Sequence, residues 1–223
     1  MSREPRGVPF WSPEEVAASI PATLAHLERN GVLAYPTETV YGFGGAIDSV
    51  SVERLVAVKR RPAGKPFLLL ISGSEMIGRL GLHLSNAASV LAARFWPGPL
   101  TLVLRGGERR VPGRLRGPEG GVAVRWTSHT GLQRLIGAMG DPLTSTSANR
   151  PGRPAAMSAA DILAQFSGEV ALGTLRLLDG GALQASSAST VVDCTSRRPR
   201  VIRPGAISAA SLRESVADLV GDH

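Results

Sequence analysis

Short apolar runs alternate with helical patterns along most of this 223-residue chain. A short apolar run bounded by turn residues is typical of a strand, whereas a longer amphipathic pattern indicates a helix. The predicted strands are 32–35, 67–71, 101–104, 122–126, 142–145, 175–178, 190–192 and 201–203. Strands that alternate with helices favour a mixed α/β sheet covered by helices. Because the last strands follow one another closely, part of the sheet is expected to be antiparallel, unlike a regular Rossmann fold.

The first helix has the clearest sequence signals. Ser12 is the predicted N-cap, Pro13 takes the first helical position, and Glu15 completes a capping box. The helix is expected to end at Asn30 and Gly31. The other predicted helices are 52–59, 87–95, 131–139, one that starts at 158, and 211–220. Segment 106–121 is rich in Gly, Pro and Arg, which predicts an exposed excursion.

Composition places the chain among ordinary globular proteins. It is 43% hydrophobic and 19% charged, and its length suits one large domain or at most two small ones. No stretch approaches the roughly 20 apolar residues that span a bilayer, and the N-terminus lacks the apolar segment of a secretory signal. The single cysteine, Cys194, excludes an internal disulfide and a cysteine-based zinc site. We therefore expect a buried thiol in a cytoplasmic protein without membrane contact.

The net charge of +7 comes almost entirely from arginine. The only lysines, Lys59 and Lys65, both lie in the segment KRRPAGK. In a chain that otherwise uses arginine, this pair indicates a site that needs compact ammonium groups, although chance clustering is the alternative. A helix C-terminus also attracts cations through its dipole. Four neighbouring cations nevertheless favour an anionic partner such as a triphosphate, and no P-loop or dinucleotide motif offers another phosphate site.

Further polar residues follow the predicted strands, where ligands of α/β sheets usually bind. In TETVYG the hydroxyl of Thr37 could bind a small polar substrate or satisfy its own turn. The run STSAN, from Ser145 to Asn149, could donate several uncharged hydrogen bonds to phosphate, ribose or an amino acid, or form an Asx or Ser/Thr turn. Ser189 and Arg203 accompany the last strands.

Arg125 lies on the apolar strand VAVRW and is expected to be partly buried. A buried arginine needs a carboxylate or phosphate partner. Other kinds of site have little support. The four histidines lack metal-ligand spacing and a triad context, and the acidic residues are scattered. Few aromatics are available for stacking single-stranded nucleic acid.

Taken in order, PTETVYGFG, KRRP, FWPGPLTLVL, VAVR, TSAN, STVVD and IRPGAIS resemble the YrdC/TsaC family of threonylcarbamoyl-AMP synthases over nearly the whole chain. The resemblance implies a twisted mixed parallel and antiparallel α/β sheet, flanked by helices, around a large cationic cavity. It implies one catalytic domain over 1–223, with a core at about 12–208 and without the extra C-terminal domain of longer relatives.

The same resemblance implies a nucleotidyltransferase that uses ATP, L-threonine and bicarbonate with Mg²⁺. It would release pyrophosphate and supply threonylcarbamoyl-AMP for the threonylcarbamoyladenosine (t6A) modification of tRNA. Contact with tRNA or another RNA, and transfer of the product to a threonylcarbamoyl transferase, are further implied partners. No membrane partner is expected.

The family's site residues carry over by motif. Its K-x-R pair falls on Lys59 and Arg61, to which we assign an electrostatic catalytic role, and its S-x-N pair falls on Ser147 and Asn149. The positions associated with threonine are Thr37, Arg125, Ser145 and Ser189. The positions near the nucleotide are Arg61, Lys65, Ser147, Asn149 and Arg203. No residue is assigned to a metal, and none stands out as a general base.

Two residues depart from the family pattern N-P-L-x-x-H that follows K-x-R-P. Lys65 replaces the asparagine and Leu70 stands where the histidine would be. One substrate contact is therefore missing or is supplied by another group. Two alternatives stay open: an enzyme that makes a different carbamoyl adenylate, and an RNA-binding module without ATP turnover.

Overall fold

The computed structural model describes residues 7–61 and 66–221. Within them the strands form one mixed sheet in the order β1-β9-β2-β3-β8-β4-β7-β6-β10-β11, with β5 paired to β6. The strands are β1 (Val8–Pro9), β2 (Val32–Tyr35), β3 (Gly42–Gly44), β4 (Leu68–Ile71), β5 (Leu82–His83), β6 (Leu100–Gly106), β7 (Val122–Trp126), β8 (Leu143–Ser147), β9 (Leu175–Asp179), β10 (Thr190–Asp193) and β11 (Arg200–Arg203).

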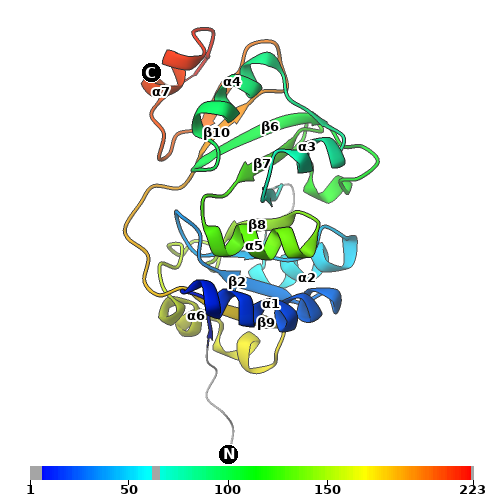
Figure 1. Cartoon of the computed structure of the whole chain (residues 1–223), viewed down its shortest axis with the longest axis vertical. Coiled ribbons are helices and arrows are strands. Elements are labelled where there is room, and N and C mark those ends of the chain that lie inside the picture. Colours follow the sequence, from blue (N-terminus) through cyan, green and yellow to red (C-terminus); the bar gives the residue numbers. More distant parts are fainter. Residues whose placement is uncertain (1–6, 62–65, 222–223) are drawn as a thin grey trace, which may run out of the picture.

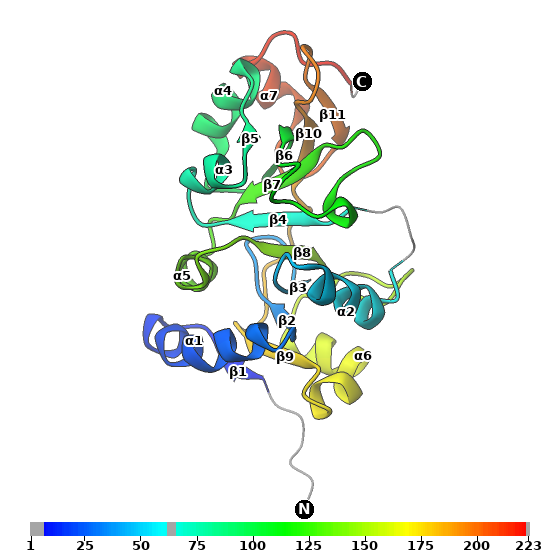
Figure 2. The same cartoon turned by 90° about the vertical axis from the view of Figure 1, so that its right-hand side faces the viewer.

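Helices cover the sheet at both of its ends. The helices are α1 (Pro13–Glu28), α2 (Ser49–Lys59), α3 (Glu75–Arg79), α4 (Asn86–Phe95), α5 (Thr130–Met139), α6 (Ala159–Ala171) and α7 (Ala209–Ser215), with a 3-10 turn at Gly113–Leu115. Around β2 and β9, α1 and α5 lie on one side of the sheet and α2 and α6 on the other (Figure 2). Helices α3, α4 and α7 lie at the other end, beside β5, β6 and β10 (Figures 1 and 2).

The predicted mixed α/β sheet is confirmed. Antiparallel pairing extends beyond the last strands, because β3 pairs antiparallel with β2 and β8, and β4 pairs antiparallel with β8. Gly44 of β3 explains how the central strands come together. A Cβ atom at this position would collide with the carbonyl oxygen of Thr144 on β8. The backbones of β3 and β8 therefore approach each other only because this residue is glycine.

The capping signals of the first helix are also confirmed. The hydroxyl of Ser12 accepts the backbone N–H of Glu15 at 3.2 Å, and the Glu15 carboxylate accepts the N–H of Ser12 at 2.9 Å. The second helix begins at Ser49, three residues before its predicted start, because the Asp48 carboxylate caps it by accepting N–H groups of the first turn.

Segment 106–121 is less exposed than predicted. The side chains of Val111 and Leu115 are buried in the core. The Arg116 guanidinium donates to the carbonyl oxygens of Gly120 and Gly106 at 2.7 and 2.8 Å, which folds the segment onto itself. The predicted excursion is therefore exposed only in part.

Two predicted boundaries were wrong. The last helix is Ala209–Ser215 and not 211–220, because Val220 leaves the helix and forms an isolated bridge with Arg200. Strand β8 runs to Ser147, so part of the STSAN run lies on the strand and not after it.

A ten-residue segment, 180–189, joins β9 to β10. In Figure 1 it runs along the left edge of the molecule, from the end that holds β9 to the end that holds β10. Leu183 N–H donates to the Met157 carbonyl at 2.8 Å, and the hydroxyl of Ser186 donates to the Thr39 carbonyl at 2.9 Å. The segment is therefore fixed to the central part of the protein along its course.

The predicted buried thiol is confirmed. Burial, with a smaller contribution from the Asp193 carboxylate, raises the pKa of the Cys194 thiol to about 12. Among residues 7–61 and 66–221, no helix combines the length and apolar character needed to cross a bilayer.

Candidate active site

A cavity of about 390 Å³ opens where the central strands meet β6, β10 and β11. Seven of the sequence-predicted site residues line it, although they are spread over most of the chain. They are Thr37, Arg61, Arg125, Ser145, Ser147, Ser189 and Arg203. The structure therefore brings together most of the residues that the sequence singled out.

Strand register explains why these residues meet. Leu68 of β4 pairs with Ser145 of β8 on one side and with Ala123 of β7 on the other, and all three line the cavity. Because side chains alternate along a strand, Arg125 lies on the same face of β7 as Ala123. Gly42 of β3 pairs with Ser147, which brings the end of the PTETVYG loop to the same place.

Lys59 lies behind this lining and contacts the turn that follows β8. Its Nζ donates to the carbonyl oxygens of Ser147 at 2.6 Å and Asn149 at 3.1 Å, and to the Asn149 side-chain oxygen at 2.8 Å. The same oxygen accepts the Ser147 hydroxyl at 2.7 Å. Lys59 is 6% exposed. Lys59 and Asn149 therefore hold Ser147 in place from behind the cavity wall.

Arg61 lies at the cavity wall. Its guanidinium donates to the Thr146 hydroxyl at 2.7 Å and to the Pro66 carbonyl at 2.8 Å. It also lies over the Phe67 ring, 4.6 Å from the centroid. Burial lowers the pKa of this guanidinium, which stays charged because an arginine pKa lies far above neutrality.

Thr37 lines the cavity, but its hydroxyl is used within its own loop. Its Oγ1 donates to the Val40 carbonyl at 2.7 Å and accepts the N–H of Thr39 at 3.1 Å and of Val40 at 3.2 Å. This is the turn interpretation that the sequence left open. Any ligand contact of Thr37 would have to share these hydrogen bonds.

Ser189 and Arg203 form the opposite wall with Thr101. The hydroxyls of Ser189 and Thr101 lie 2.9 Å apart. The Arg203 guanidinium donates to the Ser189 carbonyl at 2.8 Å and to its hydroxyl at 3.0 Å. Arg203 remains exposed at the rim. Desolvation of its guanidinium lowers its pKa, and the nearby charge of Arg125 lowers it further.

The lining of the cavity is cationic. Arg61, Arg125 and Arg203 contribute three guanidinium groups, and the lining residues within the described chain include no Asp or Glu. Serine and threonine hydroxyls lie between these cations. Such a lining can bind two anionic groups side by side, because each cation offsets the repulsion between them.

Comparison with known proteins identifies the family. Residues 25–205 match the Sua5/YciO/YrdC domain, which carries the description "Telomere recombination". The chain belongs to the Sua5/YciO/YrdC family.

Similar proteins in this family are named threonylcarbamoyl-AMP synthase. The Chromohalobacter salexigens protein is 38% identical over 184 residues, which cover 82% of this chain and 96% of the relative. The Pyrococcus abyssi protein is 36% identical over 194 residues, which cover 86% of this chain and 56% of the relative. This Sua5/YciO/YrdC chain thus spans about half the length of the Pyrococcus relative.

Solved structures of the family have the same fold. P. abyssi Sua5 in complex with L-threonine superimposes with a TM-score of 0.85 at 30% identity, covering 96% of this chain and 62% of that protein. Escherichia coli YciO gives a TM-score of 0.78 at 25% identity, covering 92% of this chain and 97% of that protein.

The two departures from the YrdC/TsaC pattern have different outcomes. Lys65 lies outside the described residues. Leu70 is fully buried on β4, in register with Arg125 of β7. Paired residues of parallel strands point to the same face. Leu70 therefore presents an apolar side chain next to Arg125, where the family's histidine would be.

Two polar residues at the site of this Sua5/YciO/YrdC protein were not predicted from the sequence. Thr101 contacts Ser189, and Glu38 lies 3.6 Å from Arg125. Thr101 had no distinguishing local signal. Glu38 did have one, because its motif follows a strand and a buried arginine needs a carboxylate partner.

The lining residues that the structure describes do not make a protein-held Mg²⁺ site. Mg²⁺ prefers carboxylate oxygens and water, whereas the described lining offers arginines and hydroxyls. Among the residues that the structure describes, no group of three or more His, Cys, Asp or Glu could hold a metal ion.

Proposed function

We propose that this protein is an L-threonylcarbamoyladenylate synthase. It converts L-threonine, bicarbonate and ATP into threonylcarbamoyl-AMP, pyrophosphate and water. The observation that carries the proposal is the cavity in which Arg61, Arg125 and Arg203 surround a set of serine and threonine hydroxyls. An amino acid and a nucleoside triphosphate both present anionic groups that match such a lining.

The relatives support this choice of substrates. The C. salexigens protein, almost all of which is matched by this chain, is named threonylcarbamoyl-AMP synthase. P. abyssi Sua5 has been solved with L-threonine bound. We therefore assign L-threonine and ATP to this chain, with threonine near Arg125, Ser145 and Ser189, and the nucleotide near Arg61, Ser147 and Arg203.

In the first step the deprotonated amine of threonine attacks the carbon of bicarbonate. An N–C bond forms, water leaves, and the product is an N-carboxylate. Arg125 is suited to bind the α-carboxylate of threonine, because it is a buried cation that lines the cavity. The site thereby holds the amine at a fixed place relative to the nucleotide.

In the second step an oxygen of the N-carboxylate attacks the α-phosphorus of ATP. The new P–O bond replaces the bond to the β-phosphate, and pyrophosphate leaves with the electron pair. Two anions must meet in this step, so Arg61 and Arg203 would stabilise the charge that develops. Lys59 would act through the Ser147 turn that it holds.

The remaining partners stay predictions. Mg²⁺ is expected to arrive with ATP. Contact with tRNA and transfer of the product to a threonylcarbamoyl transferase rest on the sequence resemblance. The cytoplasmic location rests on the composition of the chain, and the single-domain organisation rests on its length and on the resemblance.

The test is release of pyrophosphate from ATP and Mg²⁺, measured with and without L-threonine and bicarbonate. Release that requires both, with threonylcarbamoyl-AMP seen by mass spectrometry, is the expected result. Serine in place of threonine, and carbamoyl phosphate in place of bicarbonate, would reveal a different carbamoyl adenylate. RNA binding that weakens steeply with salt, without any turnover, would replace the proposal with an RNA-binding function.

A further inference from the structure

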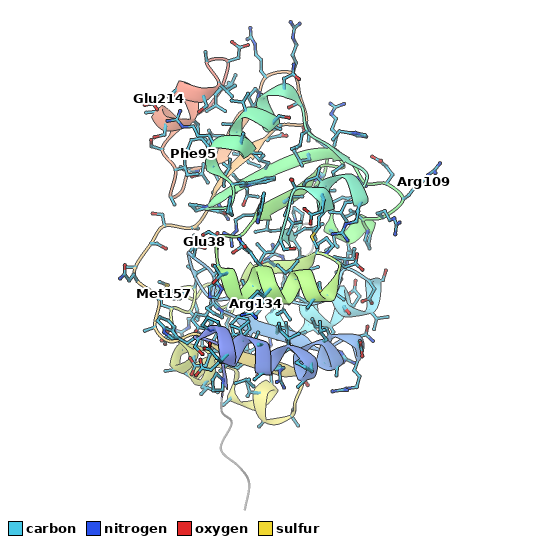
Figure 3. The ribbon with its side chains drawn as sticks, in the orientation of Figure 1. Glu38, Phe95, Arg109, Arg134, Met157 and Glu214 are labelled. Atoms are coloured by element: carbon cyan, nitrogen blue, oxygen red, sulfur yellow. The ribbon has the colours of Figure 1, made fainter. Side chains whose placement is uncertain are left out.

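Glu38 and Arg125 form a buried ion pair to which the proposed mechanism gives no role. Glu38 comes from the loop between β2 and β3, and Arg125 comes from β7. Arg125 Nε lies 3.6 Å from Glu38 Oε1, and the two side chains are 5% and 14% exposed. Figure 3 shows Glu38 above α5, between the two ends of the molecule. Within the described chain, no other carboxylate forms an ion pair with Arg125.

The two atoms that face each other in this pair are both without a hydrogen-bond partner. Glu38 Oε1 and Arg125 Nε are buried and unpaired among the described residues. Buried polar atoms are usually hydrogen-bonded. Two oppositely charged groups that face each other without a hydrogen bond therefore call for an explanation. A movement of less than about 1 Å would turn this contact into a charge-assisted hydrogen bond, which is typically 2.7–2.9 Å long.

The second carboxylate oxygen of Glu38 is fixed. It accepts the Thr127 hydroxyl at 2.6 Å. Thr127 lies two residues beyond Arg125, just after β7 ends at Trp126. The segment that contains Arg125 and Thr127 therefore also holds the Glu38 carboxylate near the Arg125 Nε atom.

The Nε and Nη1 atoms of the Arg125 guanidinium therefore face different neighbours. Its Nε faces Glu38, whereas Nη1 lies 3.4 Å from the hydroxyl of Thr39, which lines the cavity. Glu38 is absent from the described lining residues, while Arg125 belongs to them. Its neighbour Leu70 offers no acceptor. With Nε directed at Glu38, the terminal nitrogens can bind a carboxylate in the cavity bidentately.

We propose that Glu38 is a positioning residue for the amino-acid substrate and acts through Arg125. The proposal rests on the proposed function, because it takes L-threonine as the ligand of Arg125. Glu38 fixes the rotation of the guanidinium, and Arg125 makes the contact. Loss of the Glu38 charge should therefore weaken threonine binding and leave ATP binding unchanged.

The experiment measures the Kd of L-threonine by calorimetry, and kcat and KM for both substrates, in the intact chain. Glu38→Gln keeps the size of the side chain and an acceptor for Thr127 but removes the charge. Glu38→Asp keeps the charge and serves as the conservative variant. Glu214→Gln is the control, because it removes an arginine-paired carboxylate on α7, outside the cavity.

We expect Glu38→Gln to raise the Kd and KM for threonine about tenfold, with the KM for ATP and kcat changed less than about twofold. Glu38→Asp should lie between the wild type and Glu38→Gln. Arg125→Lys removes the planar guanidinium. In that background, Glu38→Gln should raise the Kd for threonine by less than about a further twofold. A thermal melt of each variant separates a binding effect from unfolding. If Glu38→Gln does not fold, the threonine Kd of Glu38→Asp is compared with that of the wild type instead.

Three results would each overturn the proposal for Glu38. They are an equal loss of affinity for threonine and ATP, an unchanged Kd for threonine, and a further rise of about tenfold in that Kd in the Arg125→Lys background. These outcomes leave the proposed function standing. A wild-type protein that neither binds threonine nor releases pyrophosphate with it would instead remove the proposed function, and the role of Glu38 with it.

Discussion

The ammonium group of Lys59 lies 2.6 Å from the carbonyl oxygen of Ser147, across 88 residues of sequence. A buried ammonium needs several acceptors to compensate for lost water. Here the turn of Ser147 and Asn149 supplies oxygens from both its backbone and its side chains. The cation and the turn therefore stabilise each other, and Ser147 is presented to the cavity as a result.

Lys59→Ala is expected to reduce pyrophosphate release by at least about 100-fold, because a small displacement of Ser147 misplaces the nucleotide. The protein should also lose about 1–3 kcal/mol of unfolding free energy, since the turn oxygens lose a buried donor. Steady-state assays and urea unfolding check the two effects. Arg54→Ala, which removes an exposed cation from the same helix, is the control. Wild-type turnover in Lys59→Ala would remove the turn from the mechanism.

Arg61→Lys keeps the positive charge but loses the planar guanidinium group with its several N–H donors. A lysine cannot reach both Thr146 and Pro66 while lying flat on Phe67. We expect the KM for ATP to rise about tenfold with a small change in melting temperature. Kinetics at saturating threonine measure this, with Arg94→Lys at an exposed ion pair as the control. A KM for ATP equal to that of the wild type would show that charge alone suffices.

Gly44→Ala should lower the unfolding free energy by about 3 kcal/mol or more, because the new methyl group would overlap the Thr144 carbonyl. Gly78→Ala is the matched control. Nothing lies within 4 Å of a Cβ atom at this helical position, so alanine should be neutral or add up to about 1 kcal/mol. Urea unfolding of both variants gives the comparison, and equal stabilities would contradict the close approach of β3 and β8.

Stability should fall on acidification through His129. Burial lowers the pKa of His129, against the raising effect of the Glu38 charge. Its Nδ1 accepts the N–H of Leu132 at the start of α5, which requires the neutral ring. Because the folded pKa is below the unfolded one, the unfolded chain binds more protons at mildly acidic pH, and stability drops as pH falls through about 6.5 and below.

His129→Asn keeps a good N-cap and removes the titration. The loss of stability between pH 7 and pH 5 should therefore be smaller in the variant than in the wild type. Denaturant unfolding at several pH values measures it. Identical pH profiles for the two proteins would exclude His129 as a contributor.

Local signals explain which parts of the fold could be predicted. The capping box at Ser12 and Glu15 is contained within a few residues, so both helix start and cap were predictable. The apolar run around Arg125 likewise gave the exact strand. Strand β3 was missed because its residues, Gly42 to Gly44, read as a loop. They form a strand only through pairing with β2 and β8.

The candidate site was predictable as a set of residues but not as a set of contacts. Most of the predicted residues line one cavity, yet the partner of each depends on register between distant strands. Nothing near Lys59 indicates Asn149, and nothing near Ser189 indicates Thr101. The partial exception is Glu38, since Arg125 on an apolar strand requires a carboxylate or a ligand.

The segment that joins β9 to β10 sets a limit on the width of the cavity. Measured along the sheet, these strands are seven strand spacings apart, which corresponds to about 33 Å. The connection from Asp179 to Thr190 can reach about 36–40 Å when fully extended. Ten residues are therefore enough to join the two strands, but they leave little length beyond the width of a flat sheet. The length of this connection sets an upper limit on how far the wall that carries Ser189 can move away from Arg125.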